Sequence, residues 1–442
     1  MTDMEEFFTG RIWLRQFCPF PVEQIDAALQ NGMLRLTKGI TESRQCTRCL
    51  ETSTDKIIAF HCSNCEKECL YCRHCIQMGR ISSCTELLTW ADPSPIPSIP
   101  HSFVWNGILT PSQKQASLEV SASVSSKAPH LVYAVCGAGK TEMLFPAIFK
   151  ALRSGKRICI AAPRIDVVLE LSPRIRSVFP ETIVHTLYGG SPVESGFASI
   201  IIATTHQLYR FQSAFDVMIV DEADAFPYSF DAALQRAVKK AMKKDAAVVY
   251  VSATPSVELL KNTSNQSRLF RRYHGYPLPV PRYKALWSYK KTFARQKIPD
   301  QLKTWVIQKI EQKKPFLLFF PSIELIEAAI PLFRKVHHSI EAVHAEDPLR
   351  KEKVMKLREK QIPGILTSTI LERGVTISDV QVAVVGADER IFDSSALIQI
   401  AGRVGRSADY PTGEVTFFHN GLSKEMDKAR KLIVSYNKGG QG

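Results

Sequence analysis

The strongest constraint on the fold is a loop of small residues that directly follows a predicted strand at 131–134. Small residues let the backbone curl, so that its amide groups and the N-terminus of the next helix face the phosphates of a nucleoside triphosphate. The pattern is that of a Walker A loop, in which Lys140 reaches the terminal phosphates and the Thr141 hydroxyl ligates Mg²⁺. Cys136 fills a variable position. The predicted ATP-binding loop consists of Ala134, Val135, Cys136, Gly137, Ala138, Gly139, Lys140 and Thr141.

A second buried strand, predicted over 217–220, ends in the acidic pair Asp221 and Glu222. At the carboxyl end of a neighbouring parallel strand, one carboxylate can hold the phosphate-bound metal and another can act as a base toward water. Alone, such a pair is usually a solvated strand end, but the loop about 80 residues earlier favours the catalytic interpretation. We therefore expect Asp221 to bind Mg²⁺ through its water shell and Glu222 to polarise the attacking water.

Apolar strands alternate with amphipathic helices after about residue 105, which is typical of an α/β fold with parallel sheets. The Pro- and Ser-rich residues 91–100 predict a linker, and 21–36 predict an amphipathic helix. No run approaches the roughly 20 apolar residues that span a bilayer. The acidic N-terminus lacks the features of a secretion signal. We expect a cytoplasmic protein that is not an integral membrane protein.

Eight of the eleven cysteines lie between Cys46 and Cys84. In a reducing compartment, repeated Cys-x2-Cys elements indicate zinc more often than disulfides, because each supplies two thiolates to one tetrahedral ion. The spacing leaves open a zinc ribbon that groups 46/49 with 62/65, a wider site that groups 46/49 with 72/75, and one or two ions. Such a site commonly replaces a core that is too small to hold a short module together. The candidate zinc ligands are Cys46, Cys49, Cys62, Cys65, Cys72 and Cys75, with Cys69 and Cys84 as spare or second-site ligands.

The order of further motifs between about 105 and 420 resembles that of superfamily 2 helicases. This resemblance implies two RecA-like parallel-sheet lobes, with helices on both faces, that clamp ATP and Mg²⁺. It implies that Gln113 reads adenine, and that 252–254 couples hydrolysis to strand movement. The coupling residues are Ser252, Ala253 and Thr254, and the implied DNA-backbone contacts are Pro163, Arg164, Thr204, Thr205 and Thr369.

The last of these motifs, over 399–406, has the form QxxGRxGR. An arginine brought to the transferring phosphoryl group stabilises its negative charge, an effect worth roughly 10³ to 10⁵ in rate in related enzymes. Arg406 is the predicted arginine finger, with Arg403 beside it at the γ-phosphate. A basic helix on a solvated face would not explain why glycines recur with the arginines. The predicted catalytic residues are Lys140, Glu222, Arg403 and Arg406.

The whole arrangement resembles the ComFA family of late competence proteins, whose motor is similar to that of PriA. The family implies an ATPase stimulated by single-stranded DNA, which acts at the cytoplasmic face of the membrane to import transforming DNA. It also implies a four-cysteine zinc finger, and partners such as ComFC, DprA and the membrane uptake channel. The oligomeric state stays open. The expected organisation is an N-terminal region (1–45), a zinc-binding module (46–90), a linker (91–104), a first lobe (105–280), an interlobe connection (281–300) and a second lobe (301–442).

The formal charge of +14 is concentrated in one fifth of the chain, because 231–315 contains 19 Lys and Arg against 5 Asp and Glu. Part of this segment interleaves cations with aromatic residues, a combination that suits phosphates and the stacking of unpaired bases. The alternative is that the aromatics form a core and the cations a solvated face. The predicted DNA contacts in the segment are Arg271, Arg272, Lys290 and Lys291.

Two competing functions follow from the same residues. A replication-restart or repair DNA helicase of the PriA type is the alternative enzyme, and the lack of a large accessory domain argues against it. A DNA-binding scaffold with a vestigial nucleotide site is the alternative from another class. The scaffold is disfavoured because Lys140, Thr141, Asp221, Glu222 and Arg406 are all present.

Overall fold

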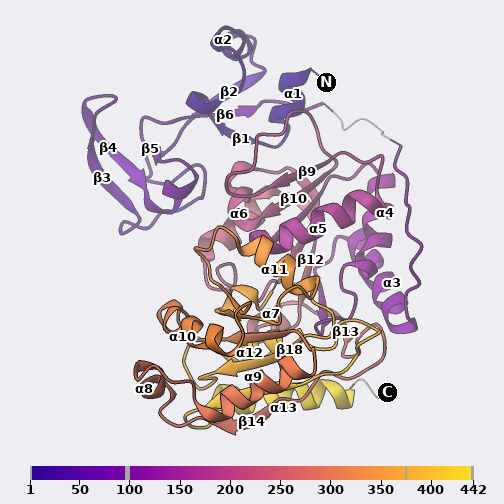
Figure 1. Ribbon diagram of the computed structural model, residues 1–442. Coiled ribbons are helices and arrows are strands. Elements are labelled where there is room, and N and C mark those ends of the chain that lie inside the picture. The colour runs from indigo at the N-terminus through magenta and orange to yellow at the C-terminus, as the bar shows by residue number, and fades with distance from the viewer. Residues whose placement is uncertain (1, 95–99, 374–375, 440–442) are drawn as a thin grey trace. The chain divides into compact units, whose positions relative to one another are not determined.

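A computed structural model describes residues 2–94, 100–373 and 376–439. The chain divides into two compact units (Figure 1): one contains residues 1–133 and 141–267, and the other contains 134–140 and 268–442. The phosphate loop therefore groups with the second unit, although the strand before it belongs to a sheet of the first.

The N-terminal 90 residues form two small antiparallel sheets. The first has the order β1-β6-β2 and the second β3-β4-β5 (Figure 1). Because β6 (Glu86–Trp90) pairs with both β1 (Ile12–Leu14) and β2 (Leu34–Lys38), the predicted boundary at residue 45 separates segments that fold together. The predicted helix over 21–36 is shorter, since the chain turns after α2 into β2. The remaining elements are α1 (Asp3–Phe8), η1 (Arg15–Phe17), α2 (Val22–Gln30), β3 (Ile57–Cys62), β4 (Lys67–Cys72), η2 (Arg73–Met78) and β5 (Ile81–Ser82).

The large sheet of the first unit has the order β13-β7-β12-β11-β8-β10-β9. Neighbours from β7 to β9 are parallel, so the carboxyl ends of β7 and β11 lie at one edge with β12 between them. Its strands are β7 (His130–Ala134), β8 (Ile158–Ala162), β9 (Val184–Leu187), β10 (Ile200–Thr204), β11 (Phe215–Asp221), β12 (Met242–Ser252) and β13 (Asn265–Leu269). Around it lie α3 (Pro111–Ser126), η3 (Glu142–Leu144), α4 (Phe145–Arg153), α5 (Ile165–Val178), η4 (Thr205–Arg210), α6 (Ala232–Ala241) and α7 (Val257–Asn262).

One hydrophobic cluster joins the N-terminal module to this sheet. It contains buried side chains of β8, β10 and β11, the apolar face of α6, and the cysteines at 46, 49, 72 and 75. Burial of apolar area stabilises by roughly 25 cal/mol per Å², so the module and the first lobe share the stabilisation that this cluster supplies. The cysteines are thus part of the first unit's core.

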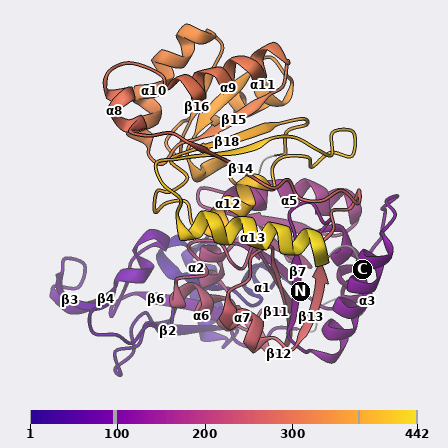
Figure 2. The ribbon, with the colours of Figure 1, turned by 90° about the horizontal axis from the view of Figure 1, so that it is seen from below.

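The second unit is built on a sheet of order β14-β19-β18-β15-β17-β16, whose pairings are all parallel. Figure 2 shows α9, α10 and α11 on one side of it and α12 and α13 on the other. Its strands are β14 (Arg282–Ala285), β15 (Phe316–Phe319), β16 (Glu341–Val343), β17 (Gly364–Thr367), β18 (Gln381–Val385) and β19 (Val415–His419). Its helices are α8 (Tyr289–Ala294), α9 (Asp300–Glu311), α10 (Ile323–Val336), α11 (Arg350–Arg358), η5 (Thr369–Leu371), α12 (Ser394–Ala401) and α13 (Lys424–Gly439).

The predicted interlobe connection over 281–300 is instead an integral part of this second unit. β14 pairs with β19, and Tyr289 and Phe293 of α8 are buried in a core with Trp305 of α9 and Phe333 of α10. The prolines of the segment led us to expect an extended linker. The predicted fold class, two parallel-sheet lobes preceded by a small cysteine-rich module, is confirmed. Within the part of the chain that the structure describes, no helix has the length and apolar character needed to cross a membrane.

Candidate active site and cysteine clusters

The phosphate loop has the curled backbone that its sequence predicts. Gly137 and Gly139 both have positive φ, +82° and +73°, a conformation that other residues rarely adopt. The Ala138 N–H donates to the Val135 carbonyl at 3.1 Å, which closes the turn. Thr141 then occupies the N-cap position of η3 without a side-chain capping hydrogen bond, and α4 follows directly. The loop therefore has the shape that presents backbone amides to phosphate.

The phosphate loop contacts the 399–406 motif, which lies in the second unit. The Cys136 Sγ donates to the Gln399 Oε1 at 2.9 Å, and both side chains are buried. A Cβ added to Gly402 would lie 2.5 Å from the Cβ of Cys136. Close approach of the loop thus explains the motif's first glycine, and Cys136 does more than fill a variable position.

Arg272 packs against the same loop. Its side chain is 2% exposed, its Nη1 donates to the Gly405 carbonyl at 2.5 Å, and its Cγ lies 3.6 Å from a Cβ built on Gly137. Next to it, the Tyr273 N–H donates to the Gly137 carbonyl at 3.0 Å. Burial lowers the pKa of Arg272 to about 10. The guanidinium is therefore not placed for the surface DNA contact that we predicted, and instead joins Gly405 to the phosphate loop.

In the first unit, the acidic motif at the end of β11 is linked to the coupling motif at the end of β12. Glu222 has a φ of +52°, and its N–H donates to Asp221 Oδ1 at 2.9 Å. The Ser252 hydroxyl donates to Asp224 Oδ1 at 2.5 Å, and the Thr254 hydroxyl donates to Asp224 Oδ2 at 2.8 Å. Asp224 was not among the predicted site residues. The sequence signal for a role was its place as the second aspartate of the 221–224 tetrapeptide. Its partners Ser252 and Thr254 become apparent only when β11 and β12 lie side by side in the sheet.

The arginines of the last motif have different environments. Arg403 is 2% exposed, and its Nε donates to the Glu372 carbonyl at 2.8 Å. Arg406 is half-buried, and its Nε donates to the Gly402 carbonyl at 3.1 Å. Thr369 begins the short helix η5, near the Glu372 carbonyl that Arg403 holds. Residues 374 and 375, which follow η5 in the sequence, lie outside the described residues.

The remaining predicted contacts of the first lobe are only partly accessible. Gln113 is 4% exposed, and its carboxamide oxygen accepts from the Thr110 N–H at 2.8 Å in a capping box. Arg164 is half-buried and pairs with Asp166 at 3.4 Å, while Pro163 and Thr204 are buried. Thr205 is completely buried, so its hydroxyl is not placed to touch a DNA backbone in this conformation. Adenine and DNA contacts at these positions stay predictions.

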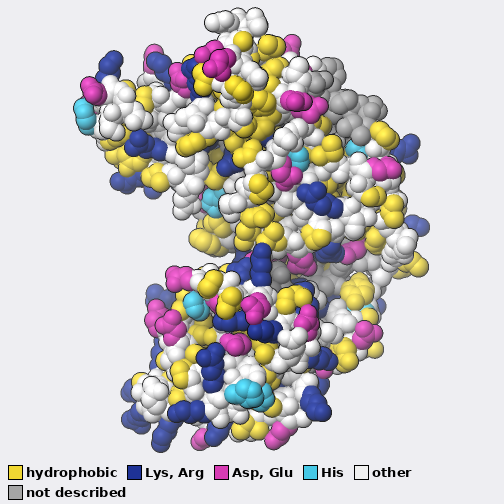
Figure 3. All heavy atoms as spheres, turned by 45° about the horizontal axis from the view of Figure 1, so that its top comes forward, with side chains coloured by type: hydrophobic (Ala, Val, Ile, Leu, Met, Phe, Trp, Pro, Cys, Tyr) yellow, Lys and Arg dark blue, Asp and Glu magenta, His cyan; other side chains and the backbone are white. Residues whose placement is uncertain are grey.

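The basic segment divides into core aromatics and exposed cations. Phe270 stacks on Tyr436, and Tyr283 stacks on Phe417, so these rings serve packing. The exposed aromatics are Tyr273, Tyr276 and Trp287. Three of the predicted DNA contacts, Arg271, Lys290 and Lys291, are exposed, and Lys290 pairs with Glu389 at 2.6 Å. On the face shown in Figure 3, Lys and Arg side chains are interspersed with Asp and Glu.

The eight clustered cysteines form two separate groups of four. Within each group, all ligand atoms lie within 4.8 Å of one another. The antiparallel register of β3 and β4 causes this division, because it pairs Ile57 with Cys72 at the base of the hairpin and Cys62 with Lys67 near its tip. The wider of the two predicted arrangements is therefore the one that forms, and the ribbon arrangement does not. The base cluster is Cys46, Cys49, Cys72 and Cys75, and the tip cluster is Cys62, Cys65, Cys69 and Cys84.

The base cluster is buried and surrounded by cationic groups. Its sulfurs are 3.7 Å (Cys46 to Cys75) and 3.4 Å (Cys49 to Cys72) apart. The Arg48 Nε donates to the Cys75 Sγ at 3.4 Å, and the Lys240 Nζ donates to the Arg48 carbonyl at 2.5 Å. Four thiolates around a dication carry a net negative charge, which these cations offset. The donor set and its surroundings fit a structural zinc ion.

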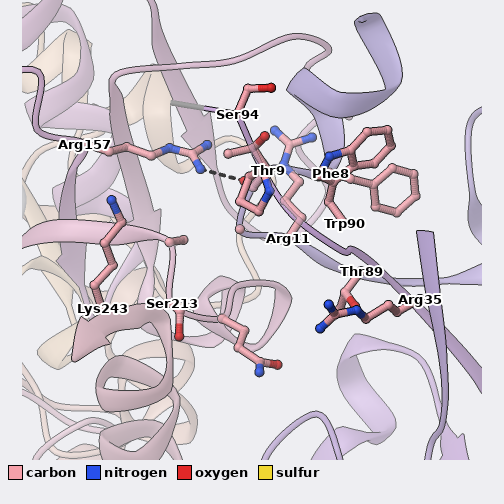
Figure 4. Close-up of a pocket in the computed structure, with 14 residues that line it drawn as sticks. Phe8, Thr9, Arg11, Arg35, Thr89, Trp90, Ser94, Arg157, Ser213 and Lys243 are labelled. Atoms are coloured by element: carbon pink, nitrogen blue, oxygen red, sulfur yellow. Dashed lines mark hydrogen bonds between the residues drawn. The ribbon is translucent and has the colours of Figure 1, made fainter. Parts of the chain in front are cut away.

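A basic cavity of about 390 Å³ lies where the N-terminal module meets the first lobe (Figure 4). The Arg157 guanidinium points toward Thr9 in Figure 4, and its Nη1 donates to the Thr9 carbonyl at 2.7 Å. Burial lowers the pKa of Arg157 to about 9. Arg11, Arg35 and Lys243 also line the cavity. Arg157 thus holds the module against the first lobe through buried hydrogen bonds.

Three family comparisons cover most of the chain. Residues 1–89 match the competence protein ComFA N-terminal domain, residues 106–257 match the type III restriction enzyme, res subunit, and residues 297–408 match the helicase conserved C-terminal domain. The chain is 42% identical to competence protein ComFA of Bacillus subtilis, over 98% of this chain and 95% of that protein. It is 38% identical to competence protein ComFA of Streptococcus pneumoniae, over 83% of this chain and 86% of that protein.

Solved helicase structures share the fold of the two lobes. Saccharomyces cerevisiae Dbp5, bound to RNA and ADP BeF3, has a TM-score of 0.55 and 14% identity over 74% of this chain and 91% of its own. Mycobacterium smegmatis helicase Lhr, bound to single-stranded DNA and AMP-PNP, has a TM-score of 0.56 and 16% identity over 76% of this chain and 48% of its own. At this identity, the likeness shows the fold alone. The two helicase family matches agree with an ATP-dependent helicase of superfamily 2.

Proposed function

This chain belongs to the ComFA family of competence proteins, and on that premise we propose that it is an ATP-driven motor that moves along single-stranded DNA during import of transforming DNA. The observation that carries the proposal is the match to competence protein ComFA over nearly the full length of both chains. The helicase matches over 106–257 and 297–408 supply the motor. No observation favours the alternative of a replication-restart helicase of the PriA type.

The proposed chemistry separates the residues that bind the phosphates of ATP from the residue that activates the attacking water. Lys140 and the loop amides bind the phosphates of ATP, and Thr141 and Asp221 would hold Mg²⁺, which would neutralise phosphate charge. Glu222 orients and deprotonates the attacking water. Its left-handed backbone is a conformation that costs about 1 kcal/mol or more and commonly occurs at functional sites.

Arg406 is the proposed arginine finger. Arg403 acts through the Glu372 carbonyl that it holds, so we assign it a positioning role within the second unit. Arg272 has a related role, since it connects Gly405 to the phosphate loop. Burial and hydrogen bonding of both arginines support these positioning roles, because a solvent-exposed DNA contact would need neither.

We propose that the base cluster binds one zinc ion, which is structural. All four of its cysteines are buried, and the four ligands leave no open coordination position for substrate. When bound, the ion fixes the Cys46 and Cys49 loop against the base of the β3–β4 hairpin. The residues around it, Arg48 and Lys240, hold this loop on α6 of the first lobe.

We further propose action at the cytoplasmic face of the membrane, with ComFC, DprA and the uptake channel as partners. Family membership is the support for these partners. Co-purification of tagged ComFC or DprA with the full chain tests them, and absence of both from the purified complex would remove this part of the proposal.

The central experiment measures the ATPase rate with single-stranded DNA, double-stranded DNA and RNA. We expect single-stranded DNA to stimulate most. Lys140→Ala and Glu222→Gln should remove hydrolysis while strand binding stays measurable, and unchanged hydrolysis in either variant would refute its role. A deletion strain should lose transformation and keep normal ultraviolet resistance; sensitivity with normal uptake would instead indicate the PriA-type alternative.

A further inference from the structure

The tip of the β3–β4 hairpin contains four cysteines that the base cluster does not use. Cys62 ends β3, Cys69 lies in β4, Cys65 lies in the turn between them, and Cys84 follows β5. Their sulfurs are 3.6 Å (Cys62 to Cys84) and 3.4 Å (Cys65 to Cys69) apart. A disulfide requires about 2.05 Å, so the thiols converge without being bonded.

The separations are those of a single tetrahedral ion. With Zn–S bonds of about 2.3 Å, tetrahedral geometry puts neighbouring sulfurs about 3.8 Å apart. All four tip-cluster sulfurs lie within 4.8 Å of one another. In an iron–sulfur cluster the four cysteines are shared among separate irons and are therefore spread farther apart. The geometry selects a mononuclear site with four thiolates.

The local backbone repeats that of the base cluster. In the first Cys-x2-Cys turn, the Leu50 N–H donates to the Cys46 carbonyl at 2.8 Å, and Leu50 has a φ of +58°. In the tip cluster, the Glu66 N–H donates to the Cys62 carbonyl at 2.8 Å, with a φ of +54°. A left-handed conformation is uncommon for residues other than glycine. Both turns therefore have the same backbone conformation, which directs the two thiols of each Cys-x2-Cys element toward a common position.

The fourth ligand of the tip cluster, Cys84, is positioned by hydrogen bonds of the two residues that precede it. The Ser83 N–H donates to the Leu70 carbonyl at 2.9 Å, and the Leu70 N–H donates to the Ser83 Oγ at 3.0 Å. These bonds hold Cys84 next to Cys69. The Ser82 Oγ lies 3.3 Å from the Cys84 Sγ, a distance at which it can donate to a thiolate.

The hairpin tip has little else to hold it together. Its residues 63–68 are polar apart from Cys65, and all of them except Cys65 are exposed. An isolated hairpin is marginally stable at best in water, and small modules without a core commonly rely on a metal. A metal at the tip would replace the missing apolar contacts.

We propose that Cys62, Cys65, Cys69 and Cys84 bind a second zinc ion, separate from the ion of the base cluster and more readily lost. The difference in lability follows from exposure. Cys84 is exposed and Cys65 is half-buried, whereas every ligand of the base cluster is buried. The second ion fastens the hairpin tip and lies outside the core that the base cluster shares with the first lobe.

Zinc content of the purified full chain tests the proposal. We expect two zinc ions per chain, one in the double variant Cys65→Ser/Cys69→Ser, and two in the control Cys18→Ser, whose thiol lies outside both clusters. Cys84→His, which restores a zinc ligand, should keep two. One ion in the unaltered chain, or two in the double variant, would overturn the second site. If the unaltered chain's one ion is lost in Cys49→Ser, the base-cluster proposal still stands.

Release kinetics give a second test on the unaltered protein, which needs no variant to fold. With a chelator and a thiol-modifying reagent, we expect two phases of zinc release, separated by at least about tenfold in rate because thiolate access differs. DNA-stimulated ATPase should survive the fast phase. A single phase that releases all zinc together with the ATPase would contradict the separate, labile site.

Discussion

Replacing Asp224 with alanine tests how the hydrolysis site communicates with strand movement. Its two carboxylate oxygens accept from Ser252 at 2.5 Å and from Thr254 at 2.8 Å. A hydrogen bond to a charged group contributes about 1.5 to 3 kcal/mol. Removing both therefore forfeits roughly 3 to 6 kcal/mol before the carboxylate's own desolvation is recovered. We expect a net loss of about 2 to 3 kcal/mol in the link between β11 and β12.

The assay compares ATP hydrolysis with and without single-stranded DNA, together with translocation along a labelled strand. Asp224→Ala should keep much of its basal hydrolysis, because Asp221 and Glu222 remain, and should lose most of the stimulation by DNA. A double-mutant cycle with Thr254→Val isolates the interaction between Asp224 and Thr254. Contacting residues in one hydrogen-bond network couple by about 0.5 to 3 kcal/mol, which at 1.4 kcal/mol per tenfold is a two- to hundredfold departure from multiplicative effects.

Two results would refute this reasoning. One is Asp224→Ala with normal stimulation by DNA and normal translocation. The other is a cycle in which the effects of Asp224→Ala and Thr254→Val simply multiply, since independent sites behave in that way. The matched control is Asp245→Ala, an exposed carboxylate on β12 near Lys127, which should change neither rate.

Four further predictions concern single sites. Glu222→Gln should abolish turnover and retain nucleotide binding, as measured by fluorescent ATP titration; retained turnover would contradict its role as the base. Arg272→Met should lower the kcat/KM for ATP roughly 10- to 100-fold, the equivalent of one charged hydrogen bond, and leave the salt dependence of DNA binding unchanged. Arg271→Met, which changes the exposed neighbour, should leave the kcat/KM for ATP unchanged and reduce the salt dependence of DNA binding. Equal effects of the two substitutions on these quantities would refute the different roles assigned to Arg271 and Arg272. Burial, with nearby Arg11, lowers the pKa of His185 from 6.5 to about 4, so the folded protein keeps it neutral while the unfolded chain takes a proton below pH 6.5. Stability should therefore fall by up to about 3 kcal/mol between pH 6.5 and 4, and thermal unfolding of His185→Asn should depend less on pH in that window. Cys49→Ser should lower both zinc content and melting temperature, and an unchanged melting temperature would argue against a structural ion.

The fold was predictable because the main chemical motifs follow strands that their continuous apolar sequences identify. Residues 217–220 and 316–319 are continuous apolar runs, which are typical of strands buried on both faces of a parallel sheet. They form β11 and β15 at those positions. The same logic failed at 281–300, where prolines suggested a connector. Pairing of Arg282–Ala285 with β19 depends on a partner more than 100 residues away, which local pattern does not reveal.

Side-chain roles were less predictable than strands, because burial depends on tertiary packing. Arg271 and Arg272 are adjacent and chemically identical. Arg271 is exposed, whereas the Arg272 side chain is only 2% exposed and packs against the phosphate loop. Spacing could not divide the cysteines either. Cys72 and Cys69 are three residues apart, but the hairpin register assigns them to different clusters. In both cases neighbouring residues with the same chemistry receive different environments.

The two cysteine clusters differ in what they can transmit to the motor. Glu51, beside the base cluster, pairs with Arg236 of α6 at 2.5 Å, and Lys240 of the same helix donates to the Arg48 carbonyl. Since α6 packs in one core with the strand that ends at Asp221, folding energy from zinc at the base cluster stabilises the lobe that carries the acidic motif. Among the described residues, none of the four tip-cluster cysteines belongs to that core, and the side chains at 63–68 other than Cys65 are exposed. An ion lost from the tip should therefore alter only the hairpin surface, while an ion lost from the base should weaken the ATPase lobe itself.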